Sequence, residues 1–442
     1  MSRAQDLGSV STRLRAIAEK ARRVPGRALV SLNHYIDVYW LHEAHRRTRK
    51  DGAVGVDQVT AEEYGRDLEG NLRSLLERLK SGQYRAPSVR RAWIPKSDGS
   101  RRPIGIPTFE DKVLQRAIAM VVEAVYEETF EDFSYGFRPS RSAHDALQCL
   151  RDGLMEMGGG WVLEVDIQNF FEELDPTHLR SFLDRRVRDG VIRRTIDKWL
   201  KAGVLEAEAQ VRRRDRGTPQ GGVISPLLAN IYLHHVVDEW YVEEVRSRLR
   251  GTSLMVRYAD DLVMAFAHEG DAQRVRAALE KRLARYGLRL HPTKTRIVPF
   301  QRPPYRADPD GGDRPGGFDF LGFTHVWERS RKGNWVIRQQ TARARQRAIL
   351  KRLAMWCRKH RHRPVGWQHR QISAALRGHD AYYGITGNAR ALGRLRHRVE
   401  RIWQKWLARR SQRGLTWERF CQRILRRFPL PRPRIVHRYA AP

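Results

Sequence analysis

Hydrophobic residues along this chain follow two different spacings, which together predict a mixed fold of helices and strands. Short apolar runs at 161–167 and 254–266 have the length and composition of buried strands. Apolar residues at helical spacing predict helices over 68–79, 110–132 and 271–286. Strands interleaved with helices in this way favour an α+β arrangement, in which a sheet is backed by helices.

The second apolar run is interrupted by adjacent Asp260 and Asp261, which predict the tight turn of a β-hairpin. Two neighbouring Asp residues also simply suit turn geometry, so this pair alone does not identify a site. Asp166, however, stands near the end of the 161–167 strand. Pairing of that strand with the hairpin would bring Asp166 against Asp260. Carboxylates from separate strands can bridge two Mg²⁺ ions about 3.5–4 Å apart for phosphoryl transfer.

Two further segments have features of nucleotide binding. Residues 217–226 form a Gly- and Pro-rich loop around Gln220, where glycines allow close backbone approach and the Gln amide can both donate and accept. An ordinary Gly/Pro loop is the alternative interpretation. Residues 89–107 predict a hairpin whose tip at 96–102 is basic, and an exposed basic turn is the alternative there.

Positive charge dominates the 442-residue chain, whose 84 Lys and Arg against 50 Asp and Glu give a formal net charge of +34. The surplus is concentrated in residues 341–442, which carry 27 Lys and Arg against 3 Asp and Glu. Positive side chains at this density repel one another unless a polyanion neutralises them, so the expected partner is nucleic acid or an anionic membrane. Because no run of 18 apolar residues is present, a membrane-spanning helix is not expected. Three widely separated cysteines predict free thiols and neither a zinc site nor a disulfide framework.

The order of Asp166, Pro-Gln-Gly at 219–221 and Tyr-Ala-Asp-Asp at 258–261 resembles the reverse transcriptases encoded by bacterial group II introns. The resemblance runs from about residue 30 to the end of the chain. Further sequence blocks that resemble this family follow in order at 55–57, 94–96, 102–108, 136–144, 287–295 and 318–323.

The resemblance implies a right-hand polymerase of the α+β class. Its fingers and palm would contain an antiparallel sheet backed by helices, followed by a helical thumb and a basic helical maturase domain X. On this basis residues 1–110 form the N-terminal extension and fingers, 111–335 the palm with part of the fingers, and 336–442 the thumb and domain X. Since the sequence stops soon after domain X, a form that lacks the endonuclease domain of some relatives is expected.

The resemblance also assigns catalytic roles. Asp166, Asp260 and Asp261 are the expected catalytic acids, and together with the carbonyl of Ile167 they would hold two Mg²⁺ ions.

Contacts to the incoming dNTP are expected from four residues. Lys96 and Arg102 would bind its triphosphate, and Gln220 would contact the nucleotide. Phe171 would pack beneath the sugar, where a bulky ring clashes with a 2′-hydroxyl and so favours dNTPs over NTPs.

Contacts to template, primer or RNA are expected from residues that are mostly basic. Tyr382 and Tyr383, in a segment that resembles domain X, could stack on bases or pack in the interior. The residues assigned to this group are Arg138, Arg141, Lys294, Gly322, Arg394 and Arg398.

The expected function is RNA-dependent DNA synthesis by a group II intron protein that also binds its intron RNA and assists splicing and retrohoming. Its partners would be intron RNA, an RNA template with a DNA primer, dNTPs and target DNA, with no membrane. The expected location is the bacterial cytoplasm, at the nucleoid when the protein meets its DNA target. The alternatives are a domesticated or defence-associated reverse transcriptase, or an RNA-binding splicing cofactor without significant polymerisation.

Overall fold

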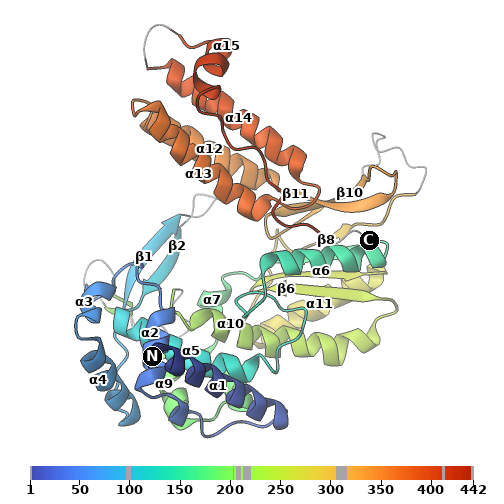
Figure 1. Ribbon diagram of the computed structural model, residues 1–442. Helices are drawn as coiled ribbons and strands as arrows, with labels where there is room; N and C mark the ends of the chain where they lie inside the picture. The colour runs from blue at the N-terminus through green and yellow to red at the C-terminus, as the bar shows by residue number, and fades with distance from the viewer. Residues whose placement is uncertain are drawn as a thin grey trace.

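The computed structural model describes residues 2–95, 101–202, 204–205, 211–212, 221–304, 316–410 and 414–439. A layer of N-terminal helices lies beside a central sheet, and a group of C-terminal helices extends away from that sheet (Figure 1). The expected Lys96 and Gln220 contacts lie outside the described residues.

Helix α5 (Phe109–Tyr126) is at the centre of the N-terminal half. Thirteen of its residues are buried, because apolar side chains cover most of its circumference. Thr108 caps its first turn by accepting a hydrogen bond from the backbone N–H of Asp111 at 3.2 Å. The helices that share its core or pack beside it are α1 (Ser2–Arg23), η1 (Asn33–Tyr35), α2 (Val38–Arg47), α3 (Ala61–Gly65), α4 (Leu68–Lys80), α8 (Pro176–Arg186) and α9 (Gly190–Lys201).

A small sheet projects next to these helices, with strand order β2-β1-β4-β5. Strands β1 (Val89–Pro95) and β2 (Arg101–Ile106) form the predicted hairpin, with Ile94 opposite Arg102. Strand β4 (Val204–Leu205) runs parallel to β1 and pairs with β5 (Val211–Arg212).

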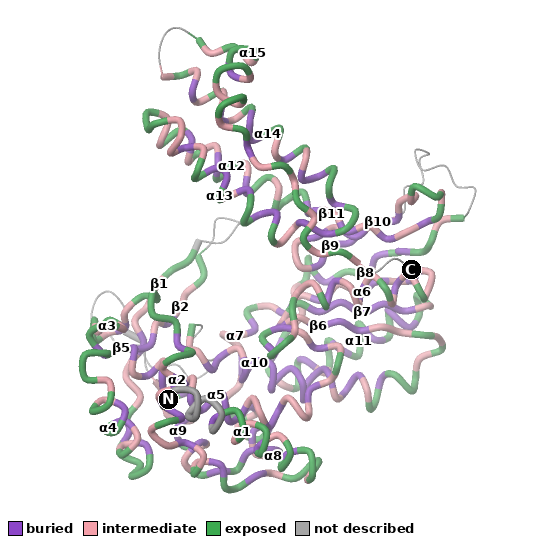
Figure 2. The backbone as a smooth tube through the Cα atoms, viewed as in Figure 1, coloured by how far each residue is buried: buried purple, intermediate pink, exposed green. Residues whose placement is uncertain are grey.

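The central sheet has the order β6-β7-β3-β8, and all its pairs are antiparallel. Its strands are β3 (Trp161–Val165), β6 (Ser253–Tyr258), β7 (Asp261–Phe266) and β8 (Arg296–Pro299). Successive strand residues point to opposite faces, so Val162 joins one hydrophobic core and Leu163 the other. Most of β3 and β7 and the middle of β6 are therefore buried on both faces, as Figure 2 shows for β6 and β7, whereas the edge strand β8 is largely exposed.

Helices cover both faces of the central sheet. Helix α6 (Ala143–Glu156) packs on one face. Helices α10 (Ser225–Leu233) and α11 (Glu269–Arg285) pack on the other. The remaining helical segments of this region are α7 (Phe170–Glu173), η2 (His234–Asp238), η3 (Tyr241–Val245) and η4 (Arg246–Arg248), of which η2 and η3 are π-helical.

The C-terminal part begins with a sheet of order β11-β10-β9, formed by β9 (Phe318–Phe320), β10 (Phe323–Arg329) and β11 (Trp335–Thr341). Helices with a separate apolar core follow it. They are α12 (Arg343–Lys359), α13 (Val365–Tyr383), α14 (Ala389–Ala408), α15 (Trp417–Phe420) and the π-helical η5 (Cys421–Leu425).

The expected α+β class, with antiparallel sheets backed by helices and a helical C-terminal part, is confirmed. Within the described ranges, no helix combines the length and apolar character needed to cross a membrane.

Candidate active site

The acidic pair lies at the end of the β-hairpin, with Asp260 in the two-residue turn between β6 and β7 and Asp261 as the first residue of β7. Tyr258 pairs with Asp261, which leaves Ala259 and Asp260 as the central residues of the turn. Ala259 has a φ of 57°, and a positive φ at this position matches the turns whose twist suits a β-hairpin. An alanine in this conformation is destabilised by roughly 1–2 kcal/mol, so its surroundings must hold the turn in place.

The third acid comes from the neighbouring strand, as the sequence predicted. Strand β3 pairs with β7 so that Val165 lies opposite Leu262, and the same register places Asp166 opposite Asp261. The carbonyl of Asp166 accepts hydrogen bonds from the N–H of His291 at 2.7 Å and the hydroxyl of Thr295 at 3.3 Å. These bonds fix the backbone of Asp166 at the end of β3.

The three acids line one polar cleft of about 270 Å³, together with Arg102, Ile167, Phe171 and Lys294. A second cavity of about 420 Å³ continues past Asp166 and Asp261 towards Asp319 and Leu321. Asp166 and Asp261 therefore lie where two open spaces meet, and Asp260 lines the first of them.

Electrostatics at the cleft favour a bound cation. Loss of surrounding water and then the charges of Asp260 and Asp166 raise the pKa of Asp261 to about 6. Loss of water and the charge of Asp166 also raise the pKa of Asp260, against the opposing effect of Arg102. Carboxylate oxygens that repel each other beside open space fit Mg²⁺, which takes a few carboxylates and keeps sites for water and phosphate.

Of the residues expected to contact the dNTP, Arg102 and Phe171 line this cleft. The segment that directly follows Gln220 is also fixed in place. Gly221 has a φ of 113°, and a Cβ there would lie 2.6 Å from the carbonyl oxygen of Gly105 in β2. The side chain of Gln115 accepts a hydrogen bond from the N–H of Val223 at 2.7 Å. Sequence reasoning missed Gln115, since a polar residue in a helix gives no signal of this contact.

Lys294 lies in the acidic cleft, with Nζ 3.3 Å from Oδ2 of Asp166. Arg138, in contrast, is buried, and it binds Glu127 as well as the carbonyl oxygens of Glu131 and Ser134. The expected direct template contact of Arg138 does not fit this burial.

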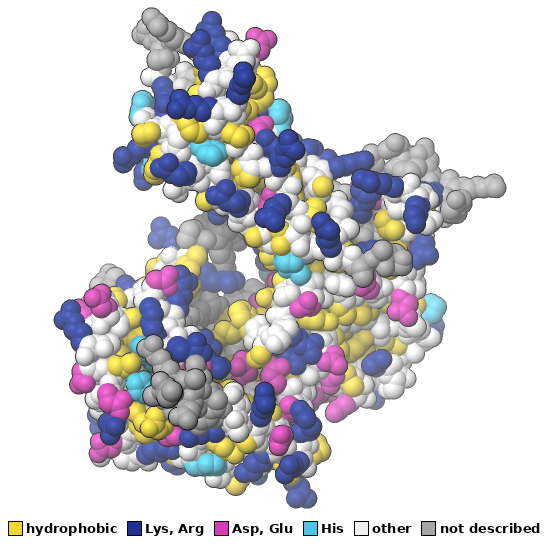
Figure 3. Space-filling model, viewed as in Figure 1, with side chains coloured by type: hydrophobic (Ala, Val, Ile, Leu, Met, Phe, Trp, Pro, Cys, Tyr) yellow, Lys and Arg dark blue, Asp and Glu magenta, His cyan; other side chains and the backbone are white. Residues whose placement is uncertain are grey.

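Arg141 is half-buried and pairs with Asp132 at 2.7 Å, over the ring of Tyr135. On α14, Arg394 and Arg398 are exposed, on the side away from the apolar stripe. Figure 3 shows many Lys and Arg side chains over the C-terminal helices.

Gly322 lies in the turn between β9 and β10, where φ is 49° at Leu321 and 82° at Gly322. The hydroxyl of Tyr382 donates to the carbonyl of Leu321 at 2.9 Å, and a Cβ at Gly322 would lie 2.9 Å from the hydroxyl of Tyr383. The paired tyrosines thus pack against this turn, which agrees with the interior alternative for them.

Comparisons with known proteins agree with the motif order. A family model described as reverse transcriptase (RNA-dependent DNA polymerase) matches residues 94–325. The chain is 34% identical over 334 residues to Protein YkfC of Escherichia coli (strain K12), a match that covers 67% of this chain and 83% of YkfC.

The names of two further relatives refer to introns. Group II intron-encoded protein LtrA of Lactococcus lactis subsp. cremoris is 39% identical over 203 residues, which cover 45% of this chain and 33% of LtrA. Nuclear intron maturase 3, mitochondrial, of Arabidopsis thaliana is 28% identical over 156 residues, which cover 35% of this chain and 21% of that protein. The matched segments thus span a third or less of both intron-related proteins.

Proposed function

The chain belongs to the reverse transcriptase (RNA-dependent DNA polymerase) family, and on that premise we propose that it copies RNA into DNA at the acidic cleft with two Mg²⁺ ions. The observation that carries the proposal is the convergence of Asp166, Asp260 and Asp261 on one open cleft beside Arg102. Three carboxylates so close together repel one another, so the site is suited to cations and to little else.

Nucleotide addition requires a primer 3′-hydroxyl to attack the α-phosphate of a dNTP while pyrophosphate leaves. When bound, two Mg²⁺ ions would neutralise the phosphate charge and activate the attacking hydroxyl. Asp166 and Asp260 would hold both ions, Asp261 would assist at the primer side, and the carbonyl of Ile167 would add a ligand. The carboxylates come from two adjacent strands of one sheet and the turn between β6 and β7, so little reorganisation is needed before the reaction.

Other residues of the cleft would position the substrates. Arg102 would bind the triphosphate from β2, and Lys294 would bind a phosphate near the primer end. Phe171 would lie beneath the sugar and exclude a 2′-hydroxyl. Lys96 and Gln220 remain assigned to the nucleotide on the basis of their motifs alone.

The C-terminal helices support a second, RNA-binding role. Residues 341–442 carry 27 Lys and Arg against 3 Asp and Glu, and Arg394 and Arg398 are exposed on α14. Such a surface suits the phosphate backbone of a folded RNA, whose deep grooves hide most base edges. We therefore also propose that the protein binds a group II intron RNA and assists the splicing and retrohoming of that intron.

The domain assignment follows from the same reasoning. We assign residues 1–110 to the N-terminal extension and fingers, 111–335 to the palm with part of the fingers, and 336–442 to the thumb and domain X. The catalytic acids then all belong to the palm, and most of the surplus positive charge belongs to the thumb and domain X.

The test separates polymerisation from RNA binding. The double variant Asp260→Ala/Asp261→Ala should lose at least about 10³-fold in RNA-templated primer extension, because its cation site is gone. The same variant should bind intron RNA as the unsubstituted protein does and support splicing of that RNA. Asp152→Ala, at an acid of α6 that pairs with Arg151, is the control and should extend primers normally. Primer extension that survives in the double variant would contradict the proposal.

A further inference from the structure

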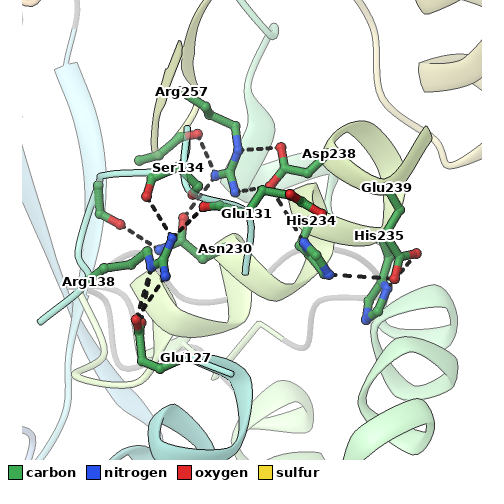
Figure 4. Close-up of polar contacts among 12 residues, drawn as sticks. Glu127, Glu131, Ser134, Arg138, Asn230, His234, His235, Asp238, Glu239 and Arg257 are labelled. Carbon is green, nitrogen blue, oxygen red and sulfur yellow. Dashed lines mark hydrogen bonds and ion pairs between the residues drawn. The ribbon is translucent and has the colours of Figure 1, made fainter. Parts of the chain in front are cut away.

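A buried ion pair joins Arg257 of strand β6, three residues before Asp260 in the chain, to Asp238 of the π-helical segment η2 (Figure 4). Arg257 is 1% exposed and Asp238 is fully buried. Nε of Arg257 donates to Oδ1 of Asp238 at 2.8 Å, and a second guanidinium nitrogen binds the other carboxylate oxygen. Apolar residues in place of such a pair often give an equally stable protein, because both charges must leave water. Stability alone therefore does not account for this pair.

The remaining guanidinium nitrogen of Arg257 reaches the turn itself. Nη1 donates to the carbonyl oxygen of Ala259 at 3.1 Å and to Oδ1 of Asn230 at 3.0 Å. That carbonyl belongs to the peptide bond that joins Ala259 to Asp260. Since Ala259 has a positive φ that alanine rarely adopts, the turn depends on such contacts. Asp238 fixes the plane of the guanidinium, which in turn fixes the peptide from which Asp260 extends.

The loop that contains Gly136 holds the same turn through a second set of contacts. A Cβ at Gly136 would overlap the backbone nitrogen of Ala259, so only glycine allows this close approach. Asn230 donates to the carbonyl oxygen of Gly136 at 2.6 Å and thereby links the loop to Arg257. The N–H of Tyr135 also donates to the carbonyl oxygen of Arg257 at 2.8 Å.

Arg138 fixes this loop to the end of α5. Its Nη1 donates to the carbonyl oxygens of Glu131 at 2.6 Å and Ser134 at 2.8 Å, and its Nη2 binds Glu127 at 3.0 Å. The turn is thus supported through Arg257 by Asp238 of η2 and Asn230 of α10, and separately by the loop after α5, which Arg138 holds in place (Figure 4).

We propose that Arg257 is a positioning residue that sets the geometry of the cation site, by holding the Ala259 carbonyl against the plane fixed by Asp238. The inference rests on the proposed function, because it assigns a cation to the acids of the turn. It predicts that loss of the Arg257 contact weakens cation binding even where the protein stays folded.

The test compares variants that differ in which charged groups remain buried beside the turn. Arg257→Met combined with Asp238→Asn removes both charges of the pair. Buried His234, which lies 3.7 Å from Asp238, keeps Glu239 as its remaining acidic partner at 3.5 Å. Arg257→Lys keeps the positive charge without the planar fork. Arg186→Gln is the matched control, because Arg186 is 4% exposed and its guanidinium likewise donates to backbone carbonyls, at Ala21, Val24 and Arg27, outside the cleft.

The first readout is the affinity of the protein for Mn²⁺ in the absence of nucleic acid, measured by electron paramagnetic resonance. The variant Asp166→Ala identifies which part of the signal comes from the acidic site. The double variant should bind Mn²⁺ at that site about 10-fold more weakly, as expected when a support of metal ligands is lost. Arg257→Lys should recover part of this affinity, and Arg186→Gln should match the unsubstituted protein. Unchanged Mn²⁺ affinity in a folded double variant would overturn the proposal, as would an equal loss in Arg186→Gln.

The second readout is steady-state primer extension. The double variant should lose about 10²-fold in kcat, the effect of an active-site displacement of about 1 Å, with the KM for dNTP nearly unchanged. If the unsubstituted protein makes no DNA, the proposed function fails, while the Mn²⁺ titration still decides the role of Arg257.

Discussion

The ammonium group of Lys294 lies 3.3 Å from a carboxylate oxygen of Asp166. Lys294 stands just before β8, and its side chain is 60% exposed, so it can move from the acid to a nucleic-acid phosphate. The contact places a cation and a proposed metal-binding acid at the junction of the two cavities. Both would then act on the end of the primer.

Phe171 is the residue expected to determine the choice between dNTPs and NTPs. Phe171→Ala should reduce the preference for dNTPs by roughly 10- to 100-fold, because the ring that clashes with a 2′-hydroxyl is removed. The ratio of kcat/KM for dCTP and CTP on one RNA template measures this preference. Phe428→Ala, at a half-buried ring among the C-terminal helices, should leave the ratio unchanged. An unchanged ratio in Phe171→Ala would refute the assignment.

Asp261 makes the stability of the protein depend on pH. Its pKa is about 6 in the folded protein against an ordinary value of 3.8, so folding favours the protonated form. Stability is therefore lost as the pH rises from about 4 to about 6, and the loss is complete above that window. Asp261→Asn should raise stability at pH 7.5 by about 1 kcal/mol, a value reduced for solvent screening because the residue lies at the mouth of an open cleft where water still reaches it.

Thermal unfolding without divalent cations checks this prediction at two pH values. Asp261→Asn should be the more stable protein at pH 7.5, whereas the two proteins should unfold alike near pH 4. Added Mg²⁺ should raise the Tm of the unsubstituted protein at pH 7.5, because it binds the folded state. A lower Tm for Asp261→Asn at pH 7.5 would contradict the electrostatic description of the cleft.

Alanine substitutions at Gly322 and Gly333 distinguish the effect of backbone strain from the effect of a lost side-chain contact. Both have a φ of 82°, but a Cβ at Gly322 would meet the hydroxyl of Tyr383, whereas a Cβ at Gly333 would meet nothing within 4 Å. Gly333→Ala should lower the free energy of unfolding by about 1 kcal/mol through strain alone. Gly322→Ala should lower it further and should also reduce primer extension, since it separates α13 from the turn beside the cleft. Equal effects of both substitutions in denaturant unfolding and primer extension would show that the Tyr383 contact is unimportant.

RNA binding should depend strongly on salt. If the protein neutralises six to ten phosphates, its affinity for intron RNA should fall on the order of 10³–10⁵-fold between 50 and 200 mM salt. Arg394→Ala and Arg398→Ala should each lower the slope of log K against log salt by about one unit. Arg276→Ala, on the exposed face of α11, is the control and should not change the slope. A flat salt response in filter-binding assays would argue against a phosphate-binding surface.

The sequence predicted the β6–β7 hairpin correctly, because two kinds of information coincide there. Apolar runs on both sides define β6 and β7, and the acidic pair between them favours a turn. Strand β8 was not predicted, because Arg296–Pro299 is short and follows a polar segment. It nevertheless completes the sheet, since it pairs with β3 on the side away from β7.

The buried residues that hold the acidic turn in place were much harder to predict from the sequence. Arg138 resembles a nucleic-acid contact in the sequence, because nothing there shows that Glu127 and two carbonyl groups enclose its guanidinium. Arg257 offers a signal that the sequence analysis did not use, because a charged residue inside an apolar strand needs a buried partner. Its partner Asp238 could not be identified from sequence, because the π-helical turn of η2 determines where that carboxylate points.

The most direct test of the central claim is a structure of the protein with an RNA template, a DNA primer and a non-hydrolysable dNTP, in which anomalous scattering locates Mn²⁺. Two Mn²⁺ ions are expected about 3.5–4 Å apart, both bound by Asp166 and Asp260. Mn²⁺ bound elsewhere, or carboxylates of Asp166 and Asp260 too far apart to share an ion in that complex, would contradict the claim.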